Sequence, residues 1–99
     1  MELIDRIAAL IAGPERDLDS IERTLTDGYA HALSLEAERQ RLERRLAEMA
    51  QDAHSGDPQA KTRELSKLAA RLDGNADELQ QLRGPLDALR RHASEIRAA

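Results

Sequence analysis

Apolar residues recur along this chain at alternating steps of three and four, the spacing of a helix that buries one stripe of its surface. The first long run comprises Leu18, Ile21, Leu25, Gly28, Ala32, Leu35, Arg39, Leu42, Leu46, Met49 and Ala53. The second comprises Leu65, Leu68, Leu72, Asn75, Leu79, Leu82, Leu86, Leu89, Ala93 and Ile96. Heptads sustained over such lengths are typical of coiled coils, so we expect two long helices.

Residues 54–58 form a cluster of turn formers between the two runs, in which Asp57 can cap the following helix and Pro58 can occupy its first position. A connection this short makes the flanking helices antiparallel neighbours. The sequence therefore predicts an all-α fold built on a long antiparallel two-helix coiled-coil hairpin. Its helices are expected at about 14–53 and 59–97.

The residues that face each other across the two helices select one register for this hairpin. With the turn centred on residue 57, facing residues have numbers that sum to 114, so Gly28 faces Leu86. Arg39 and Asn75, the strongly polar members of the two runs, then fall opposite each other. A slip of one heptad would place each against an apolar residue, at about 1–3 kcal/mol per unsatisfied group. We therefore predict that Arg39 and Asn75 set the register.

Charged residues beside the two runs agree with this register in part. Glu22 is expected near Arg90 and Arg97, and Glu36 is expected near Arg83. Exposed pairs of this kind contribute about 0–1 kcal/mol each, so they adjust the register and do not drive folding.

One level of the hairpin is irregular. Gly84-Pro85 interrupts the second run at the height of Gly28, and a proline inside a helix removes a backbone hydrogen bond. We expect a kink or a break of the last helix at residues 84–85. A hinge or a binding notch at this level is the functional alternative.

A separate short amphipathic helix, with a broad apolar face, is predicted at about residues 2–12. Gly13-Pro14 ends it, because glycine suits the position after a helix and proline suits the first turn of the next one. The face is too apolar to lie in water. The helix therefore either folds back to give a three-helix bundle at the open end of the hairpin, or exchanges with a second copy to give a domain-exchanged dimer.

Folded back, this short helix would reach only to about residues 24–25, which leaves an apolar strip of the second helix uncovered. We predict that a second copy covers the strip and that the protein forms a homodimer, with another helical protein as the alternative partner. The predicted interface residues are Leu3, Ile4, Ile7, Leu10, Ile11, Tyr29 and Leu33. Membrane-surface binding is disfavoured, because the short helix contains acids and no lysine.

The composition narrows the range of functions. The 99 residues include 34% charged residues, one tyrosine, and no tryptophan, phenylalanine or cysteine. This disfavours a β-sheet core and excludes disulfides and thiolate metal ligands. No apolar run is long enough to span a membrane. The opening stretch contains acids in place of a basic leader, so we expect one small cytoplasmic helical domain, residues 1–99.

Candidate chemistry is sparse. His31, His54 and His92 lack partners at the spacing of a zinc or di-iron site, so no metal or cofactor is predicted. Neither a phosphate-binding glycine loop nor a nucleophile elbow is present, and we predict no enzymatic activity. The arginine runs at 39–45 and 90–91 lie among acids in a chain of net charge −4, which disfavours nucleic-acid binding.

In length and shape the chain resembles the small secreted helical hairpins that carry a Trp-x-Gly turn. Its own turn is Ser55-Gly56-Asp57, and the C-terminal tyrosine signal of those proteins is missing, so no residue role is carried over. We expect a non-enzymatic coiled-coil interaction or structural adaptor module that self-associates. The alternatives are a secretion- or chaperone-like partner of another helical protein and a regulatory nucleic-acid-binding protein.

Overall fold

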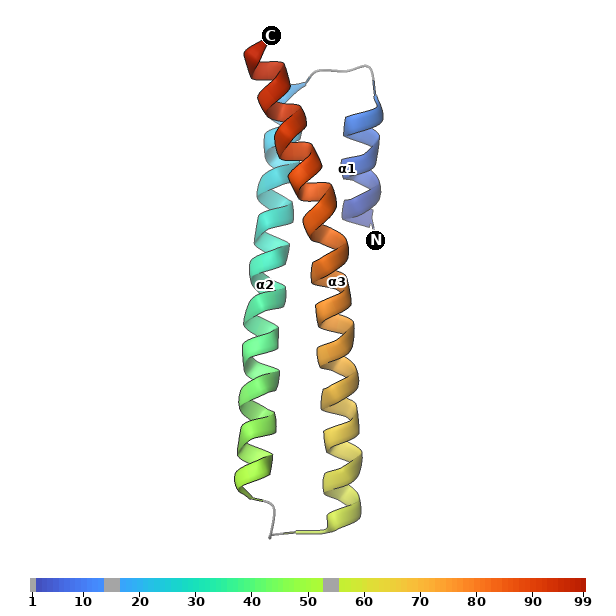
Figure 1. The fold of residues 1–99 in the computed structure, drawn as a ribbon, viewed down its shortest axis with the longest axis vertical. Helices are drawn as coiled ribbons and strands as arrows, with labels where there is room; N and C mark the ends of the chain where they lie inside the picture. The colour runs from blue at the N-terminus through green and yellow to red at the C-terminus, as the bar shows by residue number, and fades with distance from the viewer. Residues whose placement is uncertain (1, 14–16, 53–55) are drawn as a thin grey trace.

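The computed structural model describes residues 2–13, 17–52 and 56–99, which form three α-helices. These are α1 (Glu2–Ala12), α2 (Leu18–Gln51) and α3 (Pro58–Ala98). α2 and α3 form an antiparallel hairpin, and α1 lies beside it at the open end (Figure 1). The predicted all-α hairpin with a short N-terminal helix is thus confirmed. Its radius of gyration is 19.0 Å, against the ~13 Å of a compact chain of this length, so the molecule is a rod.

The start of α2 is fixed by its cap. The Asp17 carboxylate accepts hydrogen bonds from the backbone N–H groups of Asp19 and Ser20 at 3.1 and 3.3 Å, which satisfies donors that have no partner inside the helix. The helix therefore begins at Leu18, later than the expected start near residue 14. The predicted role of Pro14 in its first turn lies outside the described residues.

This cap gives the fold a defined response to acid. The pKa of Asp17 lies below its ordinary value of 3.8. The main cause is the hydrogen bond from the Ser20 hydroxyl, and the second is the hydrogen bond from the backbone N–H of Ser20. A carboxyl whose pKa is lowered by folding stabilises the fold above its unfolded pKa, and this contribution is lost as the pH falls through the folded pKa. Between about pH 5 and pH 2.5, we expect the melting temperature to fall further in the wild type than in Asp17→Ala. Equal falls, followed by circular dichroism, would exclude this role.

The turn places Gly56 in the left-handed region, at a φ of 81°, where glycine has no steric penalty. Asp57 then caps α3, its carboxylate accepting a hydrogen bond from the backbone N–H of Gln59 at 3.0 Å. Pro58 occupies the first helical position, as predicted for a proline directly after the cap, so the helix begins one residue before the approximate start at 59. The other predicted turn residues, 54 and 55, lie outside the described residues.

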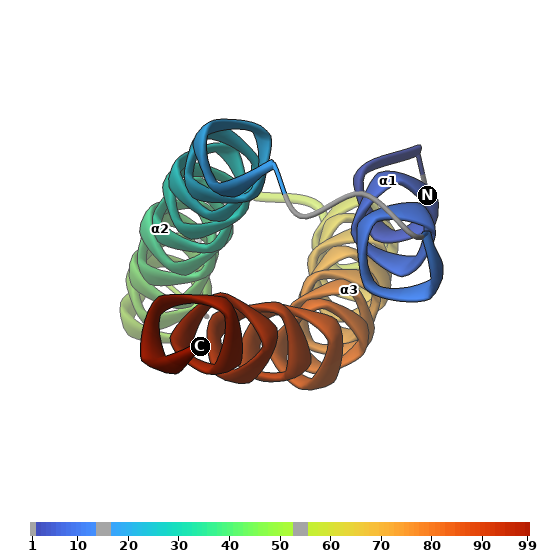
Figure 2. The same cartoon turned by 90° about the horizontal axis from the view of Figure 1, so that it is seen from above.

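α3 is one continuous helix through Gly84-Pro85, so of the expected kink or break at this position the break does not occur, and a kink stays a prediction. Proline removes the hydrogen bond to the carbonyl of Gln81, four residues earlier. Gln81 is exposed, which lets water take the place of the missing donor. The C-terminal part of α3 swings across the hairpin toward the start of α2 (Figure 2).

The core consists of two apolar clusters. The larger lies at the open end, where all three helices meet, and its buried members are Ile7, Ile21, Leu35, Leu79, Leu82, Leu86, Leu89 and Ala93. The smaller lies near the turn, between α2 and α3, and its buried members are Leu42, Met49 and Leu68. Asn75, only 4% exposed, follows the smaller cluster and precedes the larger one along α3. Most apolar burial is therefore in the half of the rod that α1 covers.

Gly28 and Leu86 face each other as the register predicts. A Cβ atom built on Gly28 would lie 3.2 Å from the Cγ of Leu86 and would overlap one of its methyl groups. Glycine at this position therefore permits the close approach of α2 and α3.

This contact predicts opposite effects for two Gly→Ala substitutions. Gly74 lies on the exposed face of α3, and a Cβ added there would have no atom within 4 Å, so Gly74→Ala should stabilise the protein by about 1 kcal/mol through helix propensity. Gly28→Ala has the same propensity gain, but it must displace buried Leu86, and overpacking costs about 1–3 kcal/mol. We expect a net loss of about 1 kcal/mol in urea denaturation. Stabilisation by both changes would contradict the close approach.

In the described part of the chain, polar side-chain pairs join α2 to α3 at three heights. They are Glu22 with Arg97, His31 with Glu78 at 2.9 Å, and Arg45 with Glu64 at 2.8 Å. The hydrogen bond from Arg45 to Glu64 raises the pKa of Arg45 above its ordinary value. Of the two expected neighbours of Glu22, Arg97 forms an ion pair with it, whereas Arg90 pairs with Asp87.

Candidate interaction surface

α1 packs against the hairpin of its own chain. Ile7 is fully buried in the larger cluster, and Leu3, Ile4 and Leu10 pack against that cluster. Arg6 donates a hydrogen bond from Nη2 to the carboxylate of Asp27 at 2.6 Å, which ties α1 to α2. The apolar face of α1 is thus used within the chain, as in the predicted three-helix bundle. Four of the predicted interface residues lie on this face.

α1 reaches further along the hairpin than expected. Glu2, at its start, lines a hollow together with His31 and Glu78. The short helix was expected to reach only to about residues 24–25 of the second helix. That expectation assumes that the second helix begins at about residue 14. Because α2 begins only at Leu18, the end of α1 meets a later part of α2.

Three of the predicted interface residues remain at the surface. Leu33 is 66% exposed, Tyr29 is 45% exposed and Ile11 is 36% exposed. Tyr29 and Leu33 are four residues apart on α2, so they are neighbours on one face of the helix. We call these two residues the bare strip. α1 covers the core of the hairpin and leaves the bare strip open.

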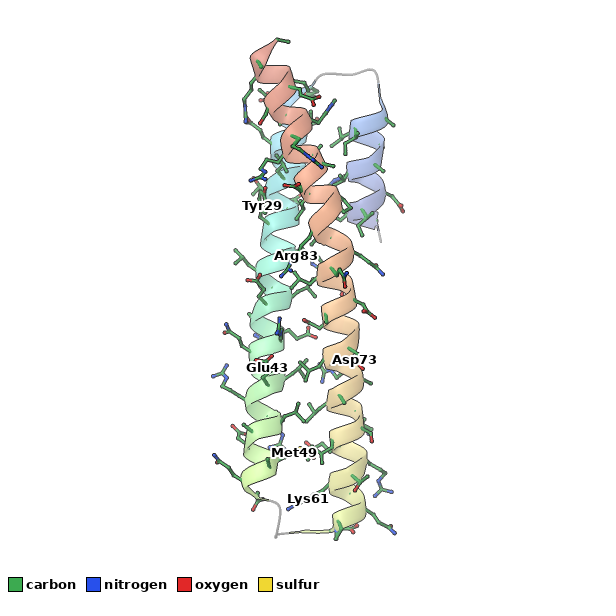
Figure 3. The ribbon with its side chains drawn as sticks, in the orientation of Figure 1. Tyr29, Glu43, Met49, Lys61, Asp73 and Arg83 are labelled. Atoms are coloured by element: carbon green, nitrogen blue, oxygen red, sulfur yellow. The ribbon has the colours of Figure 1, made fainter. Side chains whose placement is uncertain are left out.

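A shallow groove between α2 and α3 lies next to the bare strip. Its lining residues are Tyr29, Ala32, Glu36, Leu79, Arg83, Leu86, Asp87 and Arg90, and none of them belongs to α1. Leu79 and Leu86 are buried and form an apolar floor, whereas the charged residues form the rims. Figure 3 shows Tyr29 on α2 and Arg83 on α3, with Tyr29 nearer to the open end.

Glu36 and Arg83 carry the unpaired charges of this groove. Arg90 pairs with Asp87 at 2.6 Å, but neither Glu36 nor Arg83 has an ion pair or a side-chain hydrogen bond within residues 2–13, 17–52 and 56–99. The expected contact of Glu36 with Arg83 is therefore not an ion pair in this structure. An acid and a base beside an apolar floor are available to a charged partner.

The predicted register residues, Arg39 and Asn75, are not joined by a hydrogen bond in the described chain. Asn75 is buried and donates from Nδ2 to the backbone carbonyl of Leu35 at 2.8 Å, while its Oδ1 has no hydrogen-bond partner in the part of the chain that the structure describes. Arg39 is exposed, and its Nε donates to Glu43 at 3.0 Å. The preceding residue, Glu38, is half-buried, whereas Arg39 was the residue predicted to face Asn75. Asn75 thus provides the buried polar layer, and the guanidinium of Arg39 stays at the surface.

Other candidate chemistry is sparse among the described residues. No group of three or more histidine or carboxylate side chains among them could hold a metal ion. His31 pairs with Glu78, and the buried Nε2 atom of His92 has no hydrogen-bond partner within the described ranges. His54 lies outside the described residues. No helix in the described ranges has the length and apolar character needed to cross a bilayer.

The described residues thus define an all-α rod with a closed apolar face under α1 and an open groove beside the bare strip. Comparisons of the chain with protein-family models, with curated proteins and with solved structures found no match. The function is therefore inferred from the surface of the rod, and Tyr29 and Leu33 are the starting point.

Proposed function

We propose that the protein is a non-enzymatic coiled-coil interaction module that self-associates as a dimer. The observation that supports this proposal is the bare strip, because Tyr29 and Leu33 expose 45% and 66% of their surface side by side. Removing apolar surface from water favours association. Tyrosine is also enriched among the residues that dominate interface energies.

The rod shape supports the same proposal. The molecule measures 63 × 17 × 15 Å, so most of its residues lie at the surface and its core is narrow. A long face with an apolar strip and charged rims has the composition of a protein interface, in which an apolar centre is surrounded by polar groups. Such a rod suits a spacer or a docking surface for helical partners.

The oligomeric state of the full chain tests this proposal. At about 10–100 μM, where a dimer of micromolar Kd is mostly assembled, light scattering should give twice the chain mass of 11.0 kDa. The double variant Tyr29→Glu, Leu33→Glu should be monomeric with an unchanged helical spectrum. The matched control Ser66→Glu, Ala70→Glu adds the same charges one turn apart on an exposed face of α3 and should remain dimeric.

Two results would overturn the proposal. A wild-type monomer throughout this concentration range would exclude self-association. A dimer that persists in the Tyr29→Glu, Leu33→Glu variant would show that the bare strip is not the interface.

A further inference from the structure

We propose that two copies associate in parallel across the groove, with Glu36 of each copy paired with Arg83 of the other. This inference rests on the proposed function, because it specifies the arrangement of the same dimer. Glu36 and Arg83 form no ion pair among the described residues of their own chain. Glu36 lies on α2 and Arg83 lies on α3, and both line the groove beside buried Leu79.

The symmetry of a dimer decides which charges meet. A two-fold axis parallel to the rod places α2 of one copy on α3 of the other at the same height, so each acid meets a base. A two-fold axis across the rod places α2 on α2 and α3 on α3, so acid faces acid. Because a dimer interface of this kind uses the same patch twice, the first arrangement forms two ion pairs and the second forms none.

The heights of the two charges allow this pairing. In the hairpin, directly facing residues have numbers that sum to 114, as for Gly28 and Leu86. The sum for Glu36 and Arg83 is 119, an offset of five residues, or about 7.5 Å along a helix. The long side chains of glutamate and arginine together span this distance. Tyr29 would then lie over the partner's α3 near the height of Leu86.

The rod has enough surface for this dimer. A stable interface of standard size buries about 800 Å² of each partner, and a broad face of a molecule measuring 63 × 17 × 15 Å provides this area. The face that carries the groove is free of α1, since no described α1 residue lines it. The second copy can therefore approach without displacing the N-terminal helix.

The overall charge distribution acts against the parallel arrangement, but only weakly. Residues 38–72 contain eight bases and six acids, whereas the rest of the chain contains seven bases and thirteen acids. Parallel rods therefore bring the acidic ends together. Exposed charges spread along a rod are screened within about 8 Å at physiological ionic strength, whereas an ion pair that the second copy buries in the groove is screened much less. The groove pair therefore decides the orientation.

Charge reversal in the full chain tests the pairing. Glu36→Arg and Arg83→Glu should each weaken the homodimer at least about 10-fold, a loss of ~1.4 kcal/mol. The double variant should recover the wild-type Kd to within about 3-fold. An equimolar mixture of the two single variants should form a heterodimer, because the unlike chains are complementary at both contacts. Unchanged dimerisation of both single variants would overturn the inference.

Distances between labels test the orientation. The chain has no cysteine, so Gln59→Cys places a single spin label at the turn end, and Ser94→Cys places one near the open end. In a parallel dimer the two labels at position 59 should be separated by less than half of the 63 Å rod, and so should the two labels at position 94. A 59-to-59 separation close to the rod length would overturn the parallel arrangement and leave the proposed dimer standing. A wild-type monomer would contradict both the parallel arrangement and the proposed dimer.

Discussion

Leu82→Ala is expected to destabilise the protein by about 2–5 kcal/mol, whereas Leu65→Ala costs less than about 1 kcal/mol. Leu82 is fully buried in the larger core cluster, and Leu65 is 41% exposed. Both are leucines of the same heptad run in α3, so the change in helix propensity is equal at the two positions. The difference therefore measures burial and the cavity that alanine leaves. Urea denaturation followed by circular dichroism gives both free energies of unfolding.

This comparison also tests the division of the core. Leu82 lies where three helices meet, whereas Leu65 lies near the turn, where α2 and α3 are covered by no third helix of the described chain (Figure 1). If the two substitutions cost the same, the two ends of the hairpin would have equally packed cores, which contradicts the observed burial. A refolded Leu82→Ala protein with an unchanged helical spectrum at low temperature serves as the control for misfolding.

Leu65 also shows how far the heptad pattern determines the fold. Spacing identified the long helices, because a stripe of leucines at this period must be buried, and the short connection between the two runs identified their antiparallel pairing. The spacing did not determine which of two adjacent residues lies in the seam, the buried line along which α2 and α3 meet. A 3.5-residue repeat permits a step of three or four at each turn. Glu64 is half-buried and pairs with Arg45, while Leu65 lies beside the seam. Glu38 and Arg39 show the same one-residue ambiguity on α2.

The candidate surface was predicted only in part. Sequence reasoning placed Tyr29 and Leu33 on an uncovered flank, because the length of the first helix limits what it can cover. It underestimated the reach of that helix, because the start of α2 was placed at a proline and not at Asp17. Asp17 directly before the first periodic apolar residue, Leu18, is the N-cap pattern that would have located this start.

The groove could not be predicted, because it depends on how far apart the helices lie at each level. Heptad spacing brings Glu36 and Arg83 to the same flank, but it does not determine whether their side chains touch. In the structure they line the groove without forming an ion pair in the described chain. The candidate site consists of these two residues, which the sequence predicts to be neighbours and which the structure leaves without an ion pair to each other.

Asn75→Leu is expected to raise the free energy of unfolding by about 1–3 kcal/mol. The Oδ1 atom of Asn75 is buried without a hydrogen-bond partner among the described residues, and an unsatisfied buried group costs about this much. Leucine continues the heptad run between Leu72 and Leu79, and it connects the two apolar clusters. Urea denaturation measures the gain. Asn75→Ala is the control, because it removes the amide without restoring apolar contacts and should give a smaller gain or a loss.

The same substitution separates stability from register. A polar residue in a seam opposes slipped pairings, since a shift of one heptad would bury Asn75 against Ala32 or Leu46. With leucine at this position, slipped and native registers differ less in energy. Spin labels at Gln40→Cys and Gln59→Cys, one on each arm, are measured in chains diluted with excess unlabelled protein, so that distances within one chain dominate. They should give one narrow distance distribution in the wild type and a broader one with Asn75→Leu. A stabilised variant with an equally narrow distribution would show that Asn75 is not needed for the register, and that packing at Gly28 and Leu86 suffices to define it.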